Sequence, residues 1–295
     1  MIQLLARGSS DVALLQPDWF PLGLLLAVSV LYVRAIRIVA SRGRTIGLAQ
    51  IGSFYLGIAL IAAATQTSID TIGECCLLSM HMTQHMLLAD LSAPLLLFGL
   101  RAPLVYFFWP RPILVAAARN RPLRAIWRQI KRPQYALSIW LVILYVWHVP
   151  VAYEAALNHY WVHGLEHASF ALGAMLAWWP LLDPTHERVE GRMWKALYVV
   201  VARMVGGILG ILLIVPQHQI YSYYGNRATR YGISPLTDQQ LAGSIMMTID
   251  LFIVVIGFVY FFAISAEPRE KSASGERLVA RLADSVEEQD AESRQ

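Results

Sequence analysis

The chain has 295 residues, of which 57% are hydrophobic and only 15% are charged. A soluble domain carries about 25% charged residues, so a chain this apolar could not cover its core with polar surface. The composition excludes an ordinary cytosolic enzyme, a disordered chain and a nucleic-acid module. The two cysteines, Cys75 and Cys76, are adjacent and cannot form a disulfide framework.

Apolar runs of about 20 residues, each long enough to cross a bilayer core as a helix, recur along the chain. We predict seven spans, at about 19–39, 46–65, 75–99, 134–149, 159–182, 193–215 and 240–264. The predicted fold is all-α, a polytopic membrane helix bundle with seven transmembrane helices. The basic stretch 100–133, interrupted by Pro110 and Pro112, is predicted to be an interfacial segment.

The membrane domain is expected to cover 19–264, between two segments of different composition. Residues 1–18 lack the features of a cleavable signal peptide and are predicted to lie outside. Residues 265–295 are charged and rich in Ser and Glu, which is typical of a disordered cytoplasmic tail.

Basic residues are distributed unevenly between the two predicted sides. Twenty of the 24 Lys and Arg residues lie beside the inner ends of the spans or in the tail, and three lie on the opposite side. The positive-inside rule therefore predicts an outside N-terminus and a cytoplasmic C-terminus. It also explains the net charge of +4 without a nucleic-acid partner.

Seven of the eight histidines fall at the predicted outer face, although histidines were not used to assign the topology. His81 and His85 are four residues apart and share one helical face. His163 and His167 repeat this spacing in the fifth span, and His148 ends the fourth. Imidazole suits copper and zinc, and thioether suits Cu(I). Soft thioether ligands in the outer halves of the spans are Met82, Met86 and Met246.

Ionisable residues inside a membrane are costly and by default functional, so the two histidine pairs are predicted to bind a metal or cofactor. A histidine hydrogen-bonded within the core is the alternative, and packing is an equal alternative for the methionines. His148 is either a ligand or a supporting hydrogen-bonding group. His218 is expected to be exposed in a polar loop, and the cysteines are expected to be inert.

Three charged residues lie deeper in the spans. An ion pair of Arg203 with Asp250 or Asp90 would lower the cost of insertion, and a structural role is favoured over a proton relay. Gly206 and Gly210 form a G-x-x-x-G pattern, which predicts close helix packing.

Several motifs resemble the CtaG family of cytochrome c oxidase assembly membrane proteins. They are His81-Met-Thr-Gln-His85 with Ala93-Pro94, Trp147-His148-Val-Pro150, His163-Gly-Leu-Glu166-His167, Trp178-Trp179-Pro180 and Asp238-Gln239-Gln240. The resemblance covers about residues 19–264. It departs at Met247, where the family pattern has Trp.

The resemblance implies an assembly factor, not an enzyme, that handles copper for a haem–copper oxidase in a bacterial inner membrane. In this hypothesis His81, His85, His163 and His167 hold Cu(I), and the three methionines exchange as soft ligands. Glu166 and Asp238 orient imidazoles as acceptors. The implied partners are oxidase subunits, an extracytoplasmic copper donor and membrane lipid.

Three other functions stay open. Histidines on the third and fifth spans, such as His85 and His163, would suit a haem-binding membrane electron carrier. A copper transporter would need a path to the cytoplasm, which the mostly apolar inner halves of the helices disfavour. A scaffold would bind nascent oxidase without metal. An enzyme is the least favoured, because the sequence has no nucleophile–base arrangement.

Overall fold

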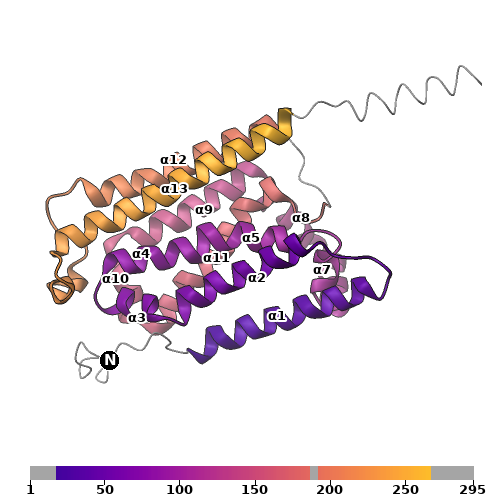
Figure 1. The fold of residues 1–295 in the computed structure, drawn as a ribbon, viewed down its shortest axis with the longest axis horizontal. Coiled ribbons are helices and arrows are strands. Elements are labelled where there is room, and N and C mark those ends of the chain that lie inside the picture. Colours follow the sequence, from indigo (N-terminus) through magenta and orange to yellow (C-terminus); the bar gives the residue numbers. More distant parts are fainter. Residues whose placement is uncertain (1–17, 187–191, 267–295) are drawn as a thin grey trace, which may run out of the picture.

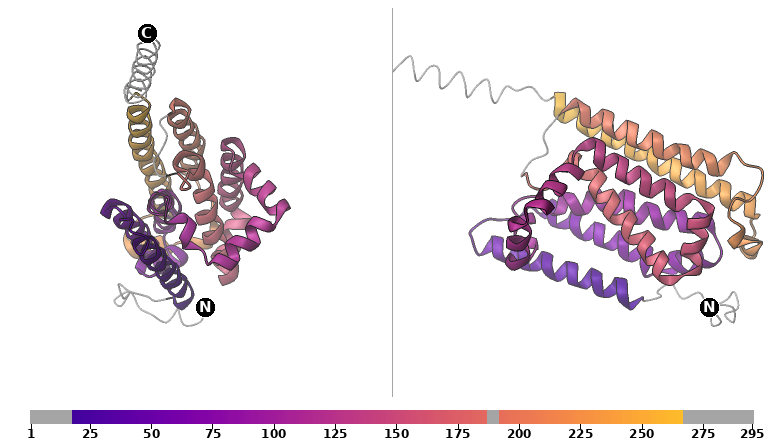
Figure 2. Two further views of the ribbon diagram at one scale, coloured as in Figure 1. Left: turned by 90° about the vertical axis from the view of Figure 1, so that its right-hand side faces the viewer. Right: turned by 180° about the vertical axis from the view of Figure 1, so that it is seen from behind.

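The computed structural model describes residues 18–186 and 192–266, which contain helices and no β-strand. The expected all-α class is confirmed. The predicted segments 1–18 and 265–295 lie almost entirely outside the described residues. Long helices run side by side in alternating directions between two ends of the bundle (Figures 1 and 2). We call these the α3 end and the α8 end, after the short helices found there.

Each predicted span coincides with a long helical segment. These are α1 (Trp19–Ala40), α2 (Leu48–Thr65), the composite of α4 (Leu78–His85), η1 (Met86–Leu91) and α5 (Ser92–Gly99), α9 (Pro133–His148), α11 (Tyr160–Leu182), α12 (Met193–Ile214) and α13 (Pro235–Ala266). Shorter elements connect them: α3 (Ser68–Cys75), α6 (Val105–Phe108), α7 (Arg111–Arg119), α8 (Arg121–Ile130), α10 (Pro150–Asn158), η2 (Ser222–Tyr224) and η3 (Arg227–Tyr231).

Four of these helices, α1, α2, α12 and α13, are individually long and apolar enough to cross a membrane. The pair α9 and α10 passes the same test together, but Pro150 begins α10 and the two helices meet at a bend of 73°. The segment from α4 to α5 is divided by η1. The described residues thus give four or five candidate spans, and the seven-span topology and the orientation of the termini stay predictions.

The α4–η1–α5 segment runs through the middle of the bundle and packs against α2, α11 and α13. The turn η1 has π-helical hydrogen bonding. Pro94 lies just beyond it, and proline lacks the N–H that would bond to the carbonyl of Asp90 in a regular α-helix. We attribute the wider turn to this missing bond, since π-turns absorb such breaks within helices.

Close contact between α12 and α13 depends on two glycines. A Cβ added at Gly243 would lie 2.5 Å from the carbonyl oxygen of Gly210, and one added at Gly210 would lie 2.7 Å from Cγ of Met247. The close packing predicted from the G-x-x-x-G pattern is therefore confirmed at Gly210. At Gly206 the nearest atom, a carboxylate oxygen of Asp250, would lie at an ordinary 3.5 Å.

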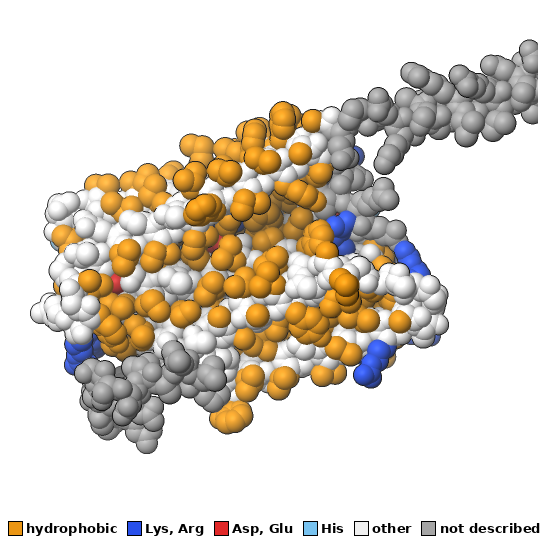
Figure 3. Space-filling model, viewed as in Figure 1, with side chains coloured by type: hydrophobic (Ala, Val, Ile, Leu, Met, Phe, Trp, Pro, Cys, Tyr) orange, Lys and Arg blue, Asp and Glu red, His pale blue; other side chains and the backbone are white. Residues whose placement is uncertain are grey.

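The outer surface of the bundle is largely apolar between its ends. Figure 3 shows hydrophobic side chains covering one face, with Lys and Arg side chains near the ends. On α13, for example, Leu251, Phe252 and Ile256 are all more than 60% exposed. Such a surface is expected where lipid rather than water surrounds the helices.

The basic stretch that we expected at the membrane interface forms α6, α7 and α8 at one end of the bundle (Figure 1). Neither α7 nor α8 has a buried residue. The Asn120 side chain caps α8 by accepting a 3.0 Å hydrogen bond from the Leu123 N–H. Trp127 of α8 contacts Trp179 of α11, with ring centroids 5.0 Å apart.

Candidate metal centre

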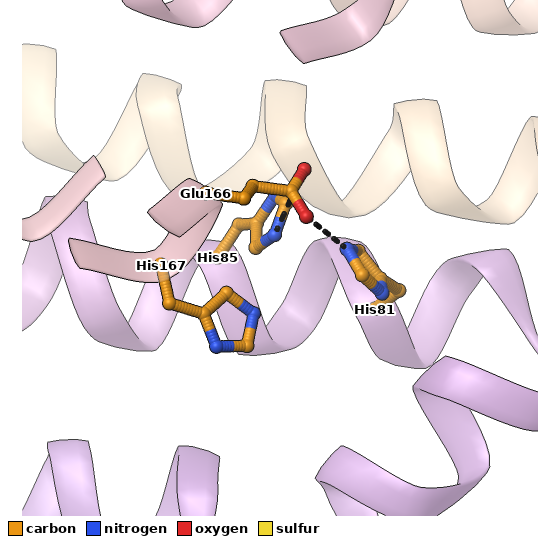
Figure 4. Close-up of side chains that lie close together, drawn as sticks. All are labelled: His81, His85, Glu166 and His167. Carbon is orange, nitrogen blue, oxygen red and sulfur yellow. Dashed lines mark ion pairs between the residues drawn. The ribbon is translucent and has the colours of Figure 1, made fainter. Parts of the chain in front are cut away.

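Two helices bring four ionisable side chains together in the half of the bundle nearest α3. His81 and His85 lie on one face of α4, and Glu166 and His167 lie on α11 (Figure 4). One ligand atom from each of the four lies within 4.8 Å of the others. His81, His85 and Glu166 are at most 1% exposed. A buried group of this composition is typical of a metal centre.

The Glu166 carboxylate lies between the two α4 imidazoles. Its Oε2 is 3.8 Å from His81 Nε2, and its Oε1 is 3.7 Å from His85 Nε2. These separations are too long for hydrogen bonds. An ion bound at about 2.0–2.1 Å from each ligand keeps neighbouring ligand atoms about 3–4 Å apart. The spacing therefore fits ligands of one shared ion better than a hydrogen-bonded triad.

Most polar atoms of this group have no hydrogen-bond partner within the described parts of the chain. Both ring nitrogens of His81 and His85, both carboxylate oxygens of Glu166 and Nε2 of His167 are buried and unsatisfied. An unsatisfied buried polar group costs about 1–3 kcal/mol, and more if it is charged. A cation would satisfy several of these atoms at once, so the residues fit a metal.

Two further histidines flank the group. His148 ends α9, and its Nδ1 lies 2.7 Å from the carbonyl oxygen of Leu144. Because that oxygen only accepts, Nδ1 carries the proton and the buried Nε2 keeps a free lone pair. The His148 ring centroid is 6.3 Å from that of His85, whereas the centroids of His163 and His167 are 4.0 Å apart. His163 therefore lies closer to the four residues than His148 does.

A chain of buried tyrosines closes the group on the side of α10. The Tyr153 ring lies 5.1 Å from His81, and its hydroxyl is 2.7 Å from that of Tyr224. Tyr224 in turn donates to the Gly73 carbonyl at 2.8 Å. Sequence reasoning missed this role, although Tyr153 lies only three residues after the Trp-His-Val-Pro motif.

The structure places Asp238 differently from our expectation. Its buried carboxylate accepts hydrogen bonds from the backbone N–H of Leu78 at 2.7 Å and of Ser79 at 3.2 Å, and from the Ser79 hydroxyl at 2.5 Å. Asp238 thus caps α4 and does not orient an imidazole. The first turn of a helix leaves N–H groups free, and a carboxylate from a distant helix satisfies two of them here.

The predicted sulfur ligands belong to the apolar core. Met82, Met86 and Met246 are each at most 4% exposed and lie in a cluster with Trp140 and Phe170. Packing accounts for this placement, and a part in ligand exchange stays a prediction.

Two acidic residues of α3 lie beside the histidines and were not among the predicted ligands. Glu74 Oε1 is 2.7 Å from His163 Nδ1, and Asp70 accepts a hydrogen bond from the Gln84 side chain. Burial, together with the nearby Glu74 charge, raises the pKa of Asp70 to about 7. Their four-residue spacing just before the third predicted span is the signal that could have revealed them.

The other two histidines of this end lie at the surface. His159 and His218 are exposed. Cys75 and Cys76, at the end of α3, are joined in a disulfide between neighbouring residues, which our sequence reasoning did not foresee.

Arg203 lies deeper in the bundle, between two acidic side chains. It donates to Asp90 of η1 and, at 3.1 Å, to Asp250 of α13. All three side chains are at most 11% exposed. Asp90 lies in the π-turn η1, before Pro94. Its ion pair with Arg203 therefore links this irregular part of the central segment to α12.

Residues 30–266 match the sequence model of the Caa3_CtaG family, described as cytochrome c oxidase caa3 assembly factor. The chain belongs to the Caa3_CtaG family. The resemblance seen in the motifs is confirmed. No curated protein and no solved structure matches this chain.

Membership of the Caa3_CtaG family indicates the cellular process in which this chain takes part. The family consists of assembly factors for a cytochrome c oxidase, and such a role suggests interaction with the oxidase and no catalytic turnover. The long apolar helices agree with a membrane protein. The family description does not mention a metal, so the centre must be interpreted from its own chemistry.

Proposed function

We propose that this chain serves the assembly of a haem–copper cytochrome c oxidase by binding copper at His81, His85, Glu166 and His167 and delivering it to the oxidase. The observation that carries the proposal is the set of buried, unsatisfied nitrogen and oxygen atoms that converge within 4.8 Å. In a membrane interior such atoms are costly unless they bind something. Oxidase assembly supplies a reason for that ligand to be copper.

The charge of the donor set suits Cu(I), because one carboxylate balances one monovalent cation. Imidazole suits copper, and Glu166 places one negative charge between two imidazoles. A monovalent ion bound there would be neutralised inside a medium that strongly penalises net charge. Met82 and Met86 remain candidate exchange ligands because they are buried and adjoin the α4 histidines in sequence, and Met246 of α13 lies with them in the core cluster.

Haem is a poorer occupant of the same place. The His85 ring packs on Phe170 with centroids 4.5 Å apart, and the His81 ring lies 5.1 Å from Tyr153. The rings of Phe170 on α11 and Tyr153 on α10 thus occupy space beside the two histidines that a porphyrin would need. A single ion needs no such space.

We further propose a seven-span topology in a bacterial inner membrane with the α3 end outside. The support is the coincidence of each predicted span with a long helical segment, and the presence of five arginines on α7 and α8, which lie at the opposite end (Figure 1). Copper would then arrive from an extracytoplasmic donor and leave sideways towards oxidase subunits.

The direct test measures copper in the purified full chain after anaerobic loading with Cu(I) in mild detergent. We expect tight copper in the wild type and loss of most of it in a His81→Ala/His85→Ala variant. His218→Ala is the matched control, because His218 is exposed. Absence of tight copper from the wild type would refute the proposal and leave a scaffold, a Soret band would indicate haem, and copper uptake into proteoliposomes would indicate a transporter.

A further inference from the structure

A second group of ligand atoms lies between the buried centre and the surface at the α3 end. Asp70 of α3 and His163 and His167 of α11 each offer one ligand atom within 4.8 Å of the others. His167 belongs to this group and to the buried centre alike. The two groups are therefore neighbours that share one ligand.

His163 has a free nitrogen that is oriented by its partner. Its Nδ1 is 2.7 Å from the Glu74 carboxylate, so Nδ1 carries the proton of the neutral ring and Nε2 keeps its lone pair. Nε2 is buried and has no hydrogen-bond partner within the described ranges, and His163 is only 6% exposed. Carboxylate–histidine pairs of this kind hold metal-binding imidazoles in place.

Backbone packing fixes α3 against α4 at the same position. A Cβ added at Gly73 would lie 3.0 Å from both Cα and N of His81, so the two helices touch where the inner ligand begins. Gln84 of α4 joins these two helices a second time, because its amide donates to Asp70 of α3, and the same amide also donates to the Ala64 carbonyl of α2. The outer group is thus attached to the helix that carries the inner one.

Exposure falls steadily from one group to the other. The Glu74 side chain is 38% exposed, the His163 side chain is 7% exposed, and the His81 and Glu166 side chains are fully buried. An ion arriving at the α3 end would meet Glu74 and His163 before it reached Glu166.

We propose that Asp70, His163 and His167 form an outer copper site, which receives Cu(I) first and passes it inward through the shared ligand His167. The inference rests on the proposed function of the buried centre and adds a route to it. Transfer is ligand substitution without electron transfer: bonds from copper to Asp70 and His163 break as bonds to Glu166 and the α4 imidazoles form, while His167 stays bound. Each site supplies one carboxylate ligand, and Glu74 adds a second negative charge beside the outer site.

The test is a loading experiment on the full chain in lipid nanodiscs, with Cu(I) supplied from a chromophoric chelator and its loss followed by stopped-flow absorbance. Asp70→Asn keeps the side-chain shape and the oxygen that accepts from Gln84. We expect this variant to load about 10-fold more slowly, with an unchanged final content of copper per chain. Glu166→Gln should keep the fast first phase but release its copper during gel filtration.

Glu154→Gln is the matched control. Glu154 is also an α3-end carboxylate, but it binds Ser222 and the Tyr223 N–H and belongs to neither group. It should load at the wild-type rate. Should Asp70→Asn misfold, Glu74→Gln tests the same site from its exposed side and should also slow loading.

Two results would contradict the proposal of an outer copper site without contradicting copper binding at the buried residues. Equal loading rates for Asp70→Asn and Glu154→Gln would show that Asp70 has no part in capture. Equal losses of copper content in Asp70→Asn and Glu166→Gln would indicate one combined site without transfer. If the wild type binds no copper at all, the proposed function fails together with this inference.

Discussion

Asp238 of α13 accepts a 2.7 Å hydrogen bond from the backbone N–H of Leu78, 160 residues earlier in the chain. This contact fixes the first turn of α4, and with it the position of His81 one turn later. The Asp238 carboxylate thereby affects the candidate metal centre indirectly, because it sets where the helix that bears two candidate ligands begins.

The capping role makes a specific prediction for Asp238→Ala. The substitution leaves two buried N–H groups of α4 without an acceptor, so we expect a loss of about 1–3 kcal/mol of stability. Copper affinity should fall with it, even at temperatures where the variant is fully folded. Asp238→Asn keeps one acceptor oxygen and should recover part of both losses. Thermal unfolding in detergent and a Cu(I) titration give the two readouts, and wild-type copper affinity in the folded alanine variant would contradict a positioning role.

Glu166→Gln should weaken copper binding without destabilising the copper-free protein. The substitution removes a buried carboxyl group that has no hydrogen-bond partner in the described structure, so the copper-free protein should be no less stable than the wild type. Copper binding should weaken by at least about 10-fold, because a charged ligand is lost. The measurement is the rise in melting temperature on adding Cu(I). At a free Cu(I) concentration 100 times Kd, binding stabilises the folded wild type by about 2.7 kcal/mol. A rise equal to that of wild type would exclude Glu166 as a ligand.

The buried ion cluster predicts a strong effect of Arg203→Met. Removing the cation leaves the Asp90 and Asp250 carboxylates facing each other in the bundle, and such losses typically cost about 3–5 kcal/mol. We expect little accumulation of this variant in membranes.

Replacing all three charges distinguishes a structural cluster from a functional one. In Arg203→Met/Asp90→Leu/Asp250→Leu no charge is left unpaired, so accumulation should recover. Oxidase maturation, assayed in cells that lack the wild-type protein, should recover with it if the cluster is only structural. Recovered accumulation without maturation would instead indicate a direct part in the process, such as proton movement.

The contact between α12 and α13 predicts unequal effects for two similar glycine substitutions. Gly243→Ala would place a methyl group 2.5 Å from the Gly210 carbonyl oxygen, so the helices must separate at a cost of about 1–3 kcal/mol. Gly207→Ala is the control, because a Cβ there would meet no atom within 4 Å. We expect a lower melting temperature for the first variant and no loss for the second. Equal melting temperatures would show that the close approach does not contribute to stability.

Local patterns in the sequence were enough to predict several parts of this molecule. The apolar runs predicted the long helices, and the four-residue spacing placed His81 with His85 and His163 with His167 on common helical faces. The separated motifs predicted the family that the comparison confirmed. These inferences succeed because helical periodicity depends only on residues within a few turns of one another.

Other features depend on contacts that the local sequence does not contain. The sequence left Asp70 and Glu74 unnoticed and assigned Asp238 to an imidazole, whereas the structure sets the first two beside His163 and the third under α4.

The sequence by itself determined that this chain forms apolar helices with paired histidines and belongs to a family of oxidase assembly factors. Only the tertiary structure decided that Glu166 lies between His81 and His85, and that His167 is shared by two groups of ligand atoms. The physical reason is that separations between helices are set by side-chain packing over the whole bundle. Close approaches such as that of Gly73 to His81, and breaks such as the π-turn before Pro94, fix the offset between α3, α4 and α11.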